Sequence, residues 1–554
     1  MTEGRDMLRS EHSGANDAGV FRSHPATISR SVSAPLLMLV VGLGLPGTVA
    51  ADQAPVQTSA TAAPVASGQA GIVARGKYLA DIGDCAACHT ASNGPKFAGG
   101  QYMETPFGPL STPNITPDKA TGIGDMTDDQ FYRVLHEGIG KNGEHLYPAM
   151  PYPWYTKVTR DDVLAIKAYL FSLAPVHAPR KPSHIRFPFN IRAGLGVWDT
   201  LFLNVGTFKP DPKASPEVNR GAYLVQGLGH CGECHNSSRL LGNAQIAGRL
   251  QGGQIENWYA PNLTSDVHTG IGKYTDQQLV TYLKTGTDPA MGVAAGPMAQ
   301  TVHESLHNLT DADLQDIVAY LKSTPAEASY HPSIRSAFTG SYPQGEEAYL
   351  TFCASCHQPD GKGLAGAVPA LAGNGTVMGK GPETVIRVVL GGIEAQGSYA
   401  PMPAIGVGMT DQQVADVTNY VRQAWGNAAP PTAGGGEVGK LRNDTHTMLN
   451  FTRPGGCPEL VQPALAKAIG DKSNGIGDAL RGVTPANMFQ TISAIIPKIR
   501  EAVPGVQQAD IVNGLTIAYC PVVAADTVPE AQKRTQLDEF ANLVYSQLVS
   551  NDQQ

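Results

Sequence analysis

Apolar positions recur at helical spacing in similar segments along the chain. In one of them Val163, Ile166 and Leu170 repeat every three or four residues, which is typical of a helix with one buried face. A threonine precedes each segment and an acidic residue follows it in the first turn. The threonine is therefore expected to cap the helix, and the acid to complement its dipole. The predicted helices run over residues 159–169, 310–320 and 410–420, and each ends in a tyrosine.

A second predicted helix opens each segment and carries a Tyr-Leu pair on its inner face. These helices contain residues 74–79, 219–224 and 347–350. The first two copies also share Pro-Asn-Ile/Leu-Thr at 113–116 and 261–264, and both continue through Thr-Gly-Ile-Gly at 121–124 and 269–272. An internal repeat of this kind predicts tandem domains. We expect them at residues 74–178, 214–326 and 341–428, with a Pro-rich connector after the first and a Gly-rich linker after the third.

The two ends of the chain lie outside the repeat. Arg22 and Arg30 precede an apolar run over 34–45 and small residues near Ala50, which predicts a signal peptide over residues 1–50. The alternative is an uncleaved anchor, but the run is shorter than the roughly 20 residues that a spanning helix needs. Residues 51–73 are rich in Ala, Gln and Ser and are expected to form a disordered linker.

The last 115 residues, 440–554, are predicted to form a helical domain without a recognisable site. Thr484 and Pro485 are expected to open a helix, since proline suits the first helical position. In the last helix four apolar residues share one face, Leu537, Phe540, Val544 and Leu548. Cys457 and Cys520 lie here, and two leftover cysteines in an oxidising compartment usually form a disulfide. The alternative is two free thiols.

The overall charge argues against one class of partner. The chain has 554 residues and a formal net charge of −8, with 42% hydrophobic and 16% charged residues. This composition is that of a globular protein. An acidic protein is repelled by the phosphates of nucleic acids, so we do not expect a nucleic acid partner, and the same charge argues mildly against an anionic membrane surface.

Six of the eight cysteines form three Cys-x-x-Cys-His motifs: Cys85, Cys88 and His89; Cys231, Cys234 and His235; Cys353, Cys356 and His357. Two thiols at this spacing can bind both vinyl groups of one haem, and the adjacent histidine can then ligate the iron. A redox Cys-x-x-Cys or half of a zinc site are the alternatives. A redox motif needs no histidine, however, and a zinc site needs a second ligand pair nearby. The sequence therefore predicts three covalently attached haem c groups.

Each copy also offers a methionine beside a proline, ahead of its last helix: Met150, Met298 and Met402. Most methionines fill cores, but recurrence at the same place in each repeat favours axial iron ligands. Met291 lies near Met298 and is the alternative in the second copy. A thioether raises the potential of the iron, and two axial ligands leave no position for oxygen or peroxide.

A proline recurs between each haem motif and its methionine, at Pro113, Pro261 and Pro369. The carbonyl group of this proline could accept a hydrogen bond from the ring N–H of the histidine and fix the orientation of the imidazole. A plain turn is the alternative.

From about Ala74 to Gly426 the chain resembles the triheme cytochrome c subunit of periplasmic, membrane-associated alcohol, gluconate and sugar or polyol dehydrogenases. The most specific motifs are residues 113–118, 121–124 and 146–152. The resemblance implies a mainly α fold with three tandem cytochrome c-like haem domains, here followed by the C-terminal helical domain of unknown type. It also assigns the Cys, His and Met residues named above to the three haems.

The same resemblance implies partners and a location. A separate catalytic subunit would oxidise substrate with flavin, a quinone cofactor or molybdopterin, and the cytochrome would pass electrons to ubiquinone or a terminal oxidase. The protein would lie in the periplasm at the outer face of the cytoplasmic membrane. Members often attach through a C-terminal amphipathic segment, and a cysteine-containing domain stands in that place here. A free-standing carrier, an oxidase-linked cytochrome and an independent haem enzyme are the alternative functions.

Overall fold

The computed structural model describes residues 68–552, except residues 92–93, 104, 106, 237–248, 256, 331–342, 408, 445–456, 458–459, 461–462 and 507. The predicted signal peptide at 1–50 and most of the predicted linker at 51–73 lie outside the described residues. Helix α1 begins at Gln69, five residues before the expected start of the first domain.

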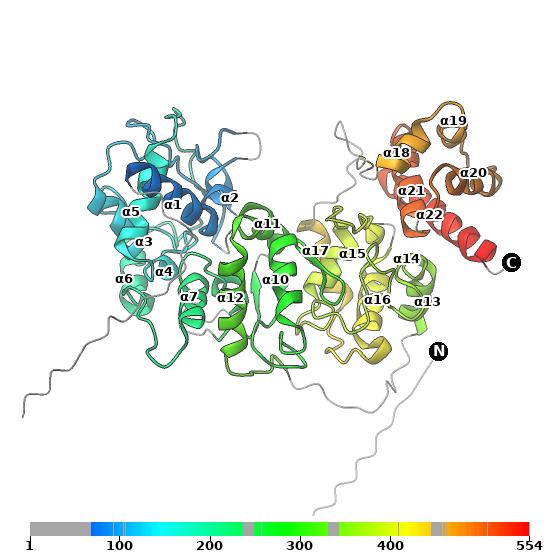
Figure 1. Cartoon of the computed structure of the whole chain (residues 1–554). Coiled ribbons are helices and arrows are strands. Elements are labelled where there is room, and N and C mark those ends of the chain that lie inside the picture. The colour runs from blue at the N-terminus through cyan, green and yellow to red at the C-terminus, as the bar shows by residue number, and fades with distance from the viewer. Residues whose placement is uncertain are drawn as a thin grey trace, which may run out of the picture. The chain divides into compact units, whose positions relative to one another are not determined.

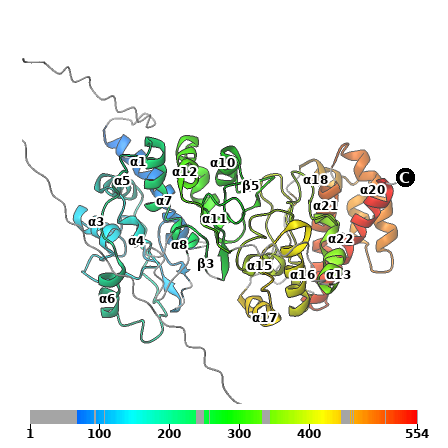
Figure 2. The ribbon, with the colours of Figure 1, turned by 90° about the horizontal axis from the view of Figure 1, so that it is seen from below.

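The described chain is mainly helical, with short antiparallel hairpins (Figures 1 and 2). The first repeat contains α1 (Gln69–Ile82), α2 (Cys85–His89), β1 (Tyr102–Met103), β2 (Leu110–Ser111), α3 (Asp128–Glu137), α4 (Tyr152–Tyr155) and α5 (Arg160–Phe171). The connector after it forms α6 (Ala193–Phe202). The second repeat contains α7 (Pro216–Gln226), α8 (Gly232–His235), β3 (Gly253–Ile255), β4 (Trp258–Ala260), α10 (Asp276–Thr285), β5 (Thr287–Asp288), β6 (Gly292–Val293), α11 (Pro297–Glu304), η2 (Leu306–Asn308) and α12 (Asp311–Ser323).

The third repeat contains α13 (Pro343–Phe352), α14 (Ala354–His357), α15 (Glu383–Gly391), η3 (Ile405–Val407), α16 (Asp411–Gln423), η4 (Ala424–Gly426) and α17 (Gly435–Asp444). The C-terminal region contains α18 (Pro463–Gly470), α19 (Ile476–Arg481), α20 (Met488–Ala502), α21 (Gln508–Ala524) and α22 (Glu530–Asp552). No helix of the described residues combines the length and the apolar character that crossing a membrane requires.

In each repeat the first helix crosses the last one at a glycine. A Cβ atom on Gly76 of α1 would lie 1.8 Å from the carbonyl oxygen of Ala165 in α5. The same approach occurs at Gly221, whose Cβ would lie 1.9 Å from the oxygen of Asp316, and in the third repeat at Gly345. Only a residue without a side chain fits between backbones this close. The glycine therefore sets the register of the helix pair that supports each candidate haem site.

This register corrects the expectation for the Tyr-Leu pair of the third repeat. In the first repeat Tyr78 lies two positions after Gly76, the glycine of the crossing, and Leu79 is buried. In the third repeat Tyr349 and Leu350 come two positions later relative to Gly345. Tyr349 is still buried, but Leu350 is 53% exposed because the shift turns it away from the core. The pair is not structurally equivalent in all three copies.

The predicted capping threonines are confirmed. Thr159, Thr310 and Thr410 each accept a hydrogen bond from the backbone N–H three residues later, at the start of α5, α12 and α16. These side chains satisfy donors that have no partner within the helix. The N-termini of the three closing helices thus lie where the sequence pattern put them.

The segment after the third closing helix is folded, although a linker over 428–436 was expected. The side chain of Asn419 in α16 donates to the carbonyl oxygen of Ala433 and accepts from its N–H, at 2.9 and 3.0 Å. Val438 and Leu441 of α17 are buried in the core of the third repeat. Helix α17 therefore packs with that repeat, beyond the expected boundary at residue 428.

The C-terminal helices enclose a core of their own. Leu537, Phe540, Val544 and Leu548 of α22 are buried in it, as their spacing predicted. A disulfide joins Cys457 to Cys520. The expected helix start at Thr484 and Pro485 is wrong. Helix α20 begins at Met488, and the N–H of Thr484 instead donates to the side chain of Asn487 in a turn.

The first two repeats meet through equivalent residues that bond reciprocally. The hydroxyl of Tyr223 in α7 donates to Asp162 in the first domain, and that of Tyr78 in α1 donates to Asp313 in the second, both at 2.6 Å. Each carboxylate also binds an arginine of its own domain, Arg75 and Arg220 respectively. The residues at equivalent positions of the two repeats are Arg75 and Arg220, Tyr78 and Tyr223, and Asp162 and Asp313.

Candidate haem sites

The three Cys-x-x-Cys-His motifs each form a single helical turn. The first occupies α2, and the second and third occupy α8 and α14 together with the cysteine before each helix, directly after the first helix of each repeat. A turn of helix brings the two cysteines of a motif to the same side and the histidine next to them. The order of elements is thus the same at all three candidate sites.

The electrostatics of the thiols argue against a redox-active cysteine pair. Burial raises the pKa of the Cys85 thiol to about 12 and that of Cys231 to about 11. Burial also raises the pKa of Cys356. A redox Cys-x-x-Cys motif needs a lowered thiol pKa to form its reactive thiolate. Apolar surroundings suit thioether links to a porphyrin better.

Each motif histidine lies within hydrogen-bond distance of a proline carbonyl. Nδ1 of His89 is 2.8 Å from the oxygen of Pro113. The corresponding distances are 2.7 Å between His235 and Pro261 and 3.0 Å between His357 and Pro369. With its proton on Nδ1 the ring donates to the carbonyl, and the lone pair on Nε2 is left for a metal.

Burial keeps these imidazoles neutral. It lowers the pKa of His357 to about 4, and it also lowers the pKa of His89 and His235. The bond to the proline carbonyl opposes this shift but does not cancel it in any of the three. A neutral imidazole is the form that can ligate iron.

A glycine also contributes to each site, and it was not predicted from the sequence. The N–H groups of Gly99, Gly252 and Gly363 donate to the carbonyl oxygens of the three motif histidines at 2.8 to 2.9 Å. All three have positive φ, between 63° and 94°, which glycine adopts readily. A Cβ on Gly99 would lie 2.4 Å from the carbonyl carbon of Pro113. The distance from histidine to glycine along the chain differs in each copy, so no spacing signal revealed it.

The repeated Pro-Asn-x-Thr motif has a structural explanation. The side chain of Asn114 donates to the carbonyl oxygen of Val176 at 2.7 Å and accepts from the N–H of Thr116. Asn262 makes the equivalent bonds to Glu327 and Thr264. Both asparagines are buried. Each one ties the loop that carries the proline carbonyl to the segment after the closing helix.

The candidate methionines occupy different local structures. Met150 lies in a tight turn, where its carbonyl oxygen accepts from the N–H of Tyr152 at 2.7 Å. Met298 lies in the first turn of α11. Met402 exchanges both backbone hydrogen bonds with Ile393. All three are partly buried, and Met291, the alternative to Met298, is partly buried in the turn between β5 and β6.

The loop of Met150 is held from outside by the connector. Oδ1 and Oδ2 of Asp199 in α6 lie 2.7 Å from the hydroxyl of Tyr152 and 2.5 Å from Nδ1 of His145. The hydroxyl of Tyr147 donates to the carbonyl oxygen of Phe189. Helix α6 was not expected from the sequence, because the connector was assigned from its proline content.

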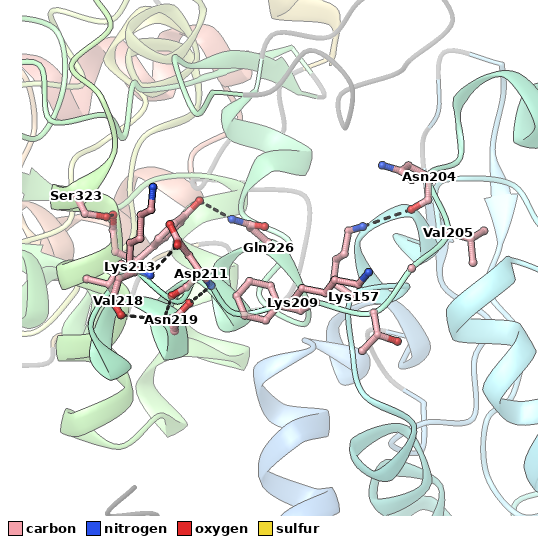
Figure 3. A pocket seen from close by; sticks show the side chains of 16 residues that line it. Lys157, Asn204, Val205, Lys209, Asp211, Lys213, Val218, Asn219, Gln226 and Ser323 are labelled. Atoms are coloured by element: carbon pink, nitrogen blue, oxygen red, sulfur yellow. Dashed lines mark hydrogen bonds between the residues drawn. The ribbon is translucent and has the colours of Figure 1, made fainter. Parts of the chain in front are cut away.

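A cavity of about 790 Å³ lies where the connector approaches the second repeat (Figure 3). Its walls come from residues 204–214, α7 and the end of α12, together with Lys157. Lys157 donates a hydrogen bond to the carbonyl oxygen of Asn204, as Figure 3 shows. The side chain of Gln226 donates to the hydroxyl of Tyr320. No cysteine, histidine or methionine lines it, so it is separate from the candidate haem sites.

Comparison with known proteins identifies the repeats. The family model of cytochrome c matches residues 73–174, 218–325 and 343–425. Among similar proteins is the cytochrome c subunit of a quinone-type alcohol dehydrogenase from Gluconacetobacter polyoxogenes. It is 38% identical over 435 residues, which are 74% of this chain and 89% of the relative.

Two further relatives belong to dehydrogenases of other substrates. The cytochrome c subunit of gluconate 2-dehydrogenase from Pantoea cypripedii is 38% identical, over 67% of this chain and 90% of its own. The cytochrome subunit of fructose dehydrogenase from Gluconobacter japonicus is 39% identical, over 64% of this chain and 80% of its own. With three matched domains, each holding a cysteine pair that implies one covalent haem c, the chain belongs to the cytochrome c family and groups with these dehydrogenase subunits.

Proposed function

We propose that the protein is the electron-transfer subunit of a periplasmic dehydrogenase. It accepts electrons from a separate catalytic subunit that uses flavin, a quinone cofactor or molybdopterin, and it passes them to ubiquinone or a terminal oxidase. It works at the outer face of the cytoplasmic membrane, to which it is attached peripherally. The observation that carries this proposal is the threefold occurrence of a cysteine pair beside a histidine whose Nδ1 lies within hydrogen-bond distance of a proline carbonyl.

In this proposal His89, His235 and His357 would bind the three irons through Nε2, and the thioether sulfurs of Met150, Met298 and Met402 would bind them as well. Haem c, when bound, supplies an iron that gains and loses one electron. The prolines 113, 261 and 369 hold the imidazole rings in one orientation through Nδ1. With a histidine and a methionine bound to each iron, no position would be left for a small molecule, so in this proposal the chain carries electrons and does not oxidise a substrate alone.

The test is purification of the tagged protein from gently solubilised membranes of its own host. We expect a stoichiometric dehydrogenase to co-purify, and the haem absorption to change when the substrate of that enzyme is added. Identification of its cofactor would then assign the class of the partner. A cytochrome that emerges alone from the soluble fraction, and that no co-expressed dehydrogenase reduces, would contradict the proposal and favour a free-standing carrier.

A further inference from the structure

Helix α6 is apolar, yet none of its ten residues, all of which the structure describes, is buried. Val197 and Leu201 lie one turn apart and therefore share a face, where they are 61% and 63% exposed. Ala193, Gly194 and Thr200 on the same side are also exposed, and none of these five residues is charged. A helix whose outer face meets only water ordinarily carries charged side chains there.

The exposed apolar surface extends to both sides of α6. Residues 186–194 are exposed without interruption, and Phe187 is 78% exposed. Of the eleven large apolar side chains exposed among the described residues, six fall within the nineteen positions 187–205, so they are concentrated in one segment. We call these six the connector patch: Phe187, Phe189, Ile191, Val197, Leu201 and Val205. A concentration of this kind marks an interaction surface.

Hydrogen bonds and a ring contact hold the segment that carries the connector patch against the first domain. The N–H of Arg186 donates to the carbonyl oxygen of Phe107 at 2.8 Å, and the rings of Phe107 and Phe189 lie 4.2 Å apart. The hydroxyl of Tyr147 and the carboxylate of Asp199 add the bonds described above. These side chains are therefore exposed in a well-bonded segment.

The charged residues next to the connector patch in the sequence are mostly basic. Arg180, Lys181, Arg186 and Arg192 are all exposed. Asp199 is the one acidic residue between positions 174 and 210, and its side chain, 10% exposed, faces His145 on the inner side. The whole chain has a formal net charge of −8, so this basic segment runs against the general charge. Aromatic and aliphatic side chains flanked by cations are typical of segments that enter an anionic lipid surface.

We propose that the connector patch inserts into the headgroup region of an anionic phospholipid bilayer and holds the cytochrome at the membrane. The inference deepens the proposed peripheral attachment and rests on the proposed periplasmic location. The occupant is lipid, because the surface combines exposed apolar side chains that can insert with exposed positive side chains beside them. On the inner side of α6, Asp199 bonds to His145 and Tyr152, which flank the Met150 loop. The anchored surface is therefore the opposite side of α6 from the first candidate haem site.

The test uses the full mature chain with its haems attached. It is sedimented with vesicles of phosphatidylglycerol and phosphatidylethanolamine, and separately with vesicles of phosphatidylcholine alone. The double variant Val197→Ser, Leu201→Ser should lose about tenfold or more in affinity for the anionic vesicles, since two side chains no longer insert. Arg186→Gln should weaken binding and reduce its salt dependence. Leu350→Ser, which alters a leucine of the third repeat that is 53% exposed, should bind as the unaltered chain does.

The outcomes separate this inference from the proposed function. Unchanged haem spectra in the variants show that the first domain is intact. The inference is wrong if the unaltered chain does not bind anionic vesicles, or if the double variant binds them equally well. If the double variant instead loses only its association with the dehydrogenase, the surface docks protein and the lipid proposal is overturned. The vesicle assay needs no dehydrogenase, and reduction by a dehydrogenase needs no vesicle, so each can fail alone.

Discussion

At the residue scale, the candidate haem sites depend on main-chain groups as much as on side chains. The carbonyl of Pro113 orients His89, and the N–H of Gly99 binds the carbonyl of the same histidine. The side chain of Asn114 then holds the proline loop in place. Proline and glycine suit these roles because one fixes φ and the other permits positive φ. The orientation of the motif histidine is therefore fixed by the backbone around it.

Replacing Met150 by alanine tests its proposed role as a ligand. We expect one of the three reduction potentials to fall, and a high-spin ferric signal to appear, because the sixth position opens when the thioether is lost. Redox titration and absorption spectra would show both changes. Met126→Ala is the matched control, since it removes a buried methionine of the same domain that is not a proposed ligand. Identical spectra for the two variants would exclude Met150.

At the element scale, the crossing glycines connect sequence to architecture. Gly76, Gly221 and Gly345 let the first and last helix of each repeat touch through their backbones. The last helices could be predicted from threonine caps and apolar spacing, and these predictions hold. The role of the glycines could not be predicted, because the distance between two backbones is set by tertiary packing and not by the local sequence pattern.

The same contrast explains which elements were missed. Helix α6 is not amphipathic in the usual sense, and its neighbours are rich in proline, so composition pointed to a plain connector. Helix α17 follows a Gly-rich stretch that reads as a linker, yet Asn419 fixes that stretch to α16 from a distance in sequence. Long-range bonds of a single side chain leave no periodic signal.

A methyl group at a crossing should destabilise the domain that contains it. For Gly221→Ala we expect a loss of about 1–3 kcal/mol in the free energy of unfolding, since the added carbon must displace a carbonyl group. Chemical denaturation followed at the haem absorption band would measure it. Gly434→Ala, where the added carbon would meet no atom within 4 Å, should change stability little. Equal stability of the two variants would rule out the crossing as the constraint.

At the scale of the whole molecule, the three repeats are not interchangeable. The first two contain the Arg, Tyr and Asp residues of the reciprocal contact. In the third, Glu347 and Gln413 stand at the positions of the tyrosine and the aspartate, counted from the crossing glycine and the capping threonine. Three domains could be recognised from the motifs alone. The motifs could not show which two domains pair through these side chains, because the pairing depends on substitutions that leave the motifs unchanged.

The reciprocal contact should weaken in alkaline solution. Burial, together with the neighbouring carboxylates, raises the pKa of Tyr78 and Tyr223 to about 12, above the usual value of about 10. The neutral phenols therefore stabilise the folded state fully below pH 10, and this contribution is lost as the pH rises toward 12. Thermal unfolding between pH 8 and 12 should show a shallower decline for the double variant Tyr78→Phe, Tyr223→Phe. A decline as steep as that of the unaltered chain, or the same flattening in the control Tyr102→Phe, would contradict this origin.

The reciprocal hydrogen bonds of Tyr78 and Tyr223 have a consequence for how a chain of this kind evolves. Each of the two domains presents a tyrosine and a carboxylate, and each is complementary to an identical copy of itself, as in a symmetric homodimer. A gene duplication that joined two such subunits would keep the ancestral dimer contact inside one polypeptide. The connector then guarantees a one-to-one ratio of the two halves, and later substitutions can specialise one half without losing its mate. The third domain has neither the tyrosine nor the aspartate at the equivalent positions. In this scheme it would have been added by fusion and would not have joined the ancestral dimer.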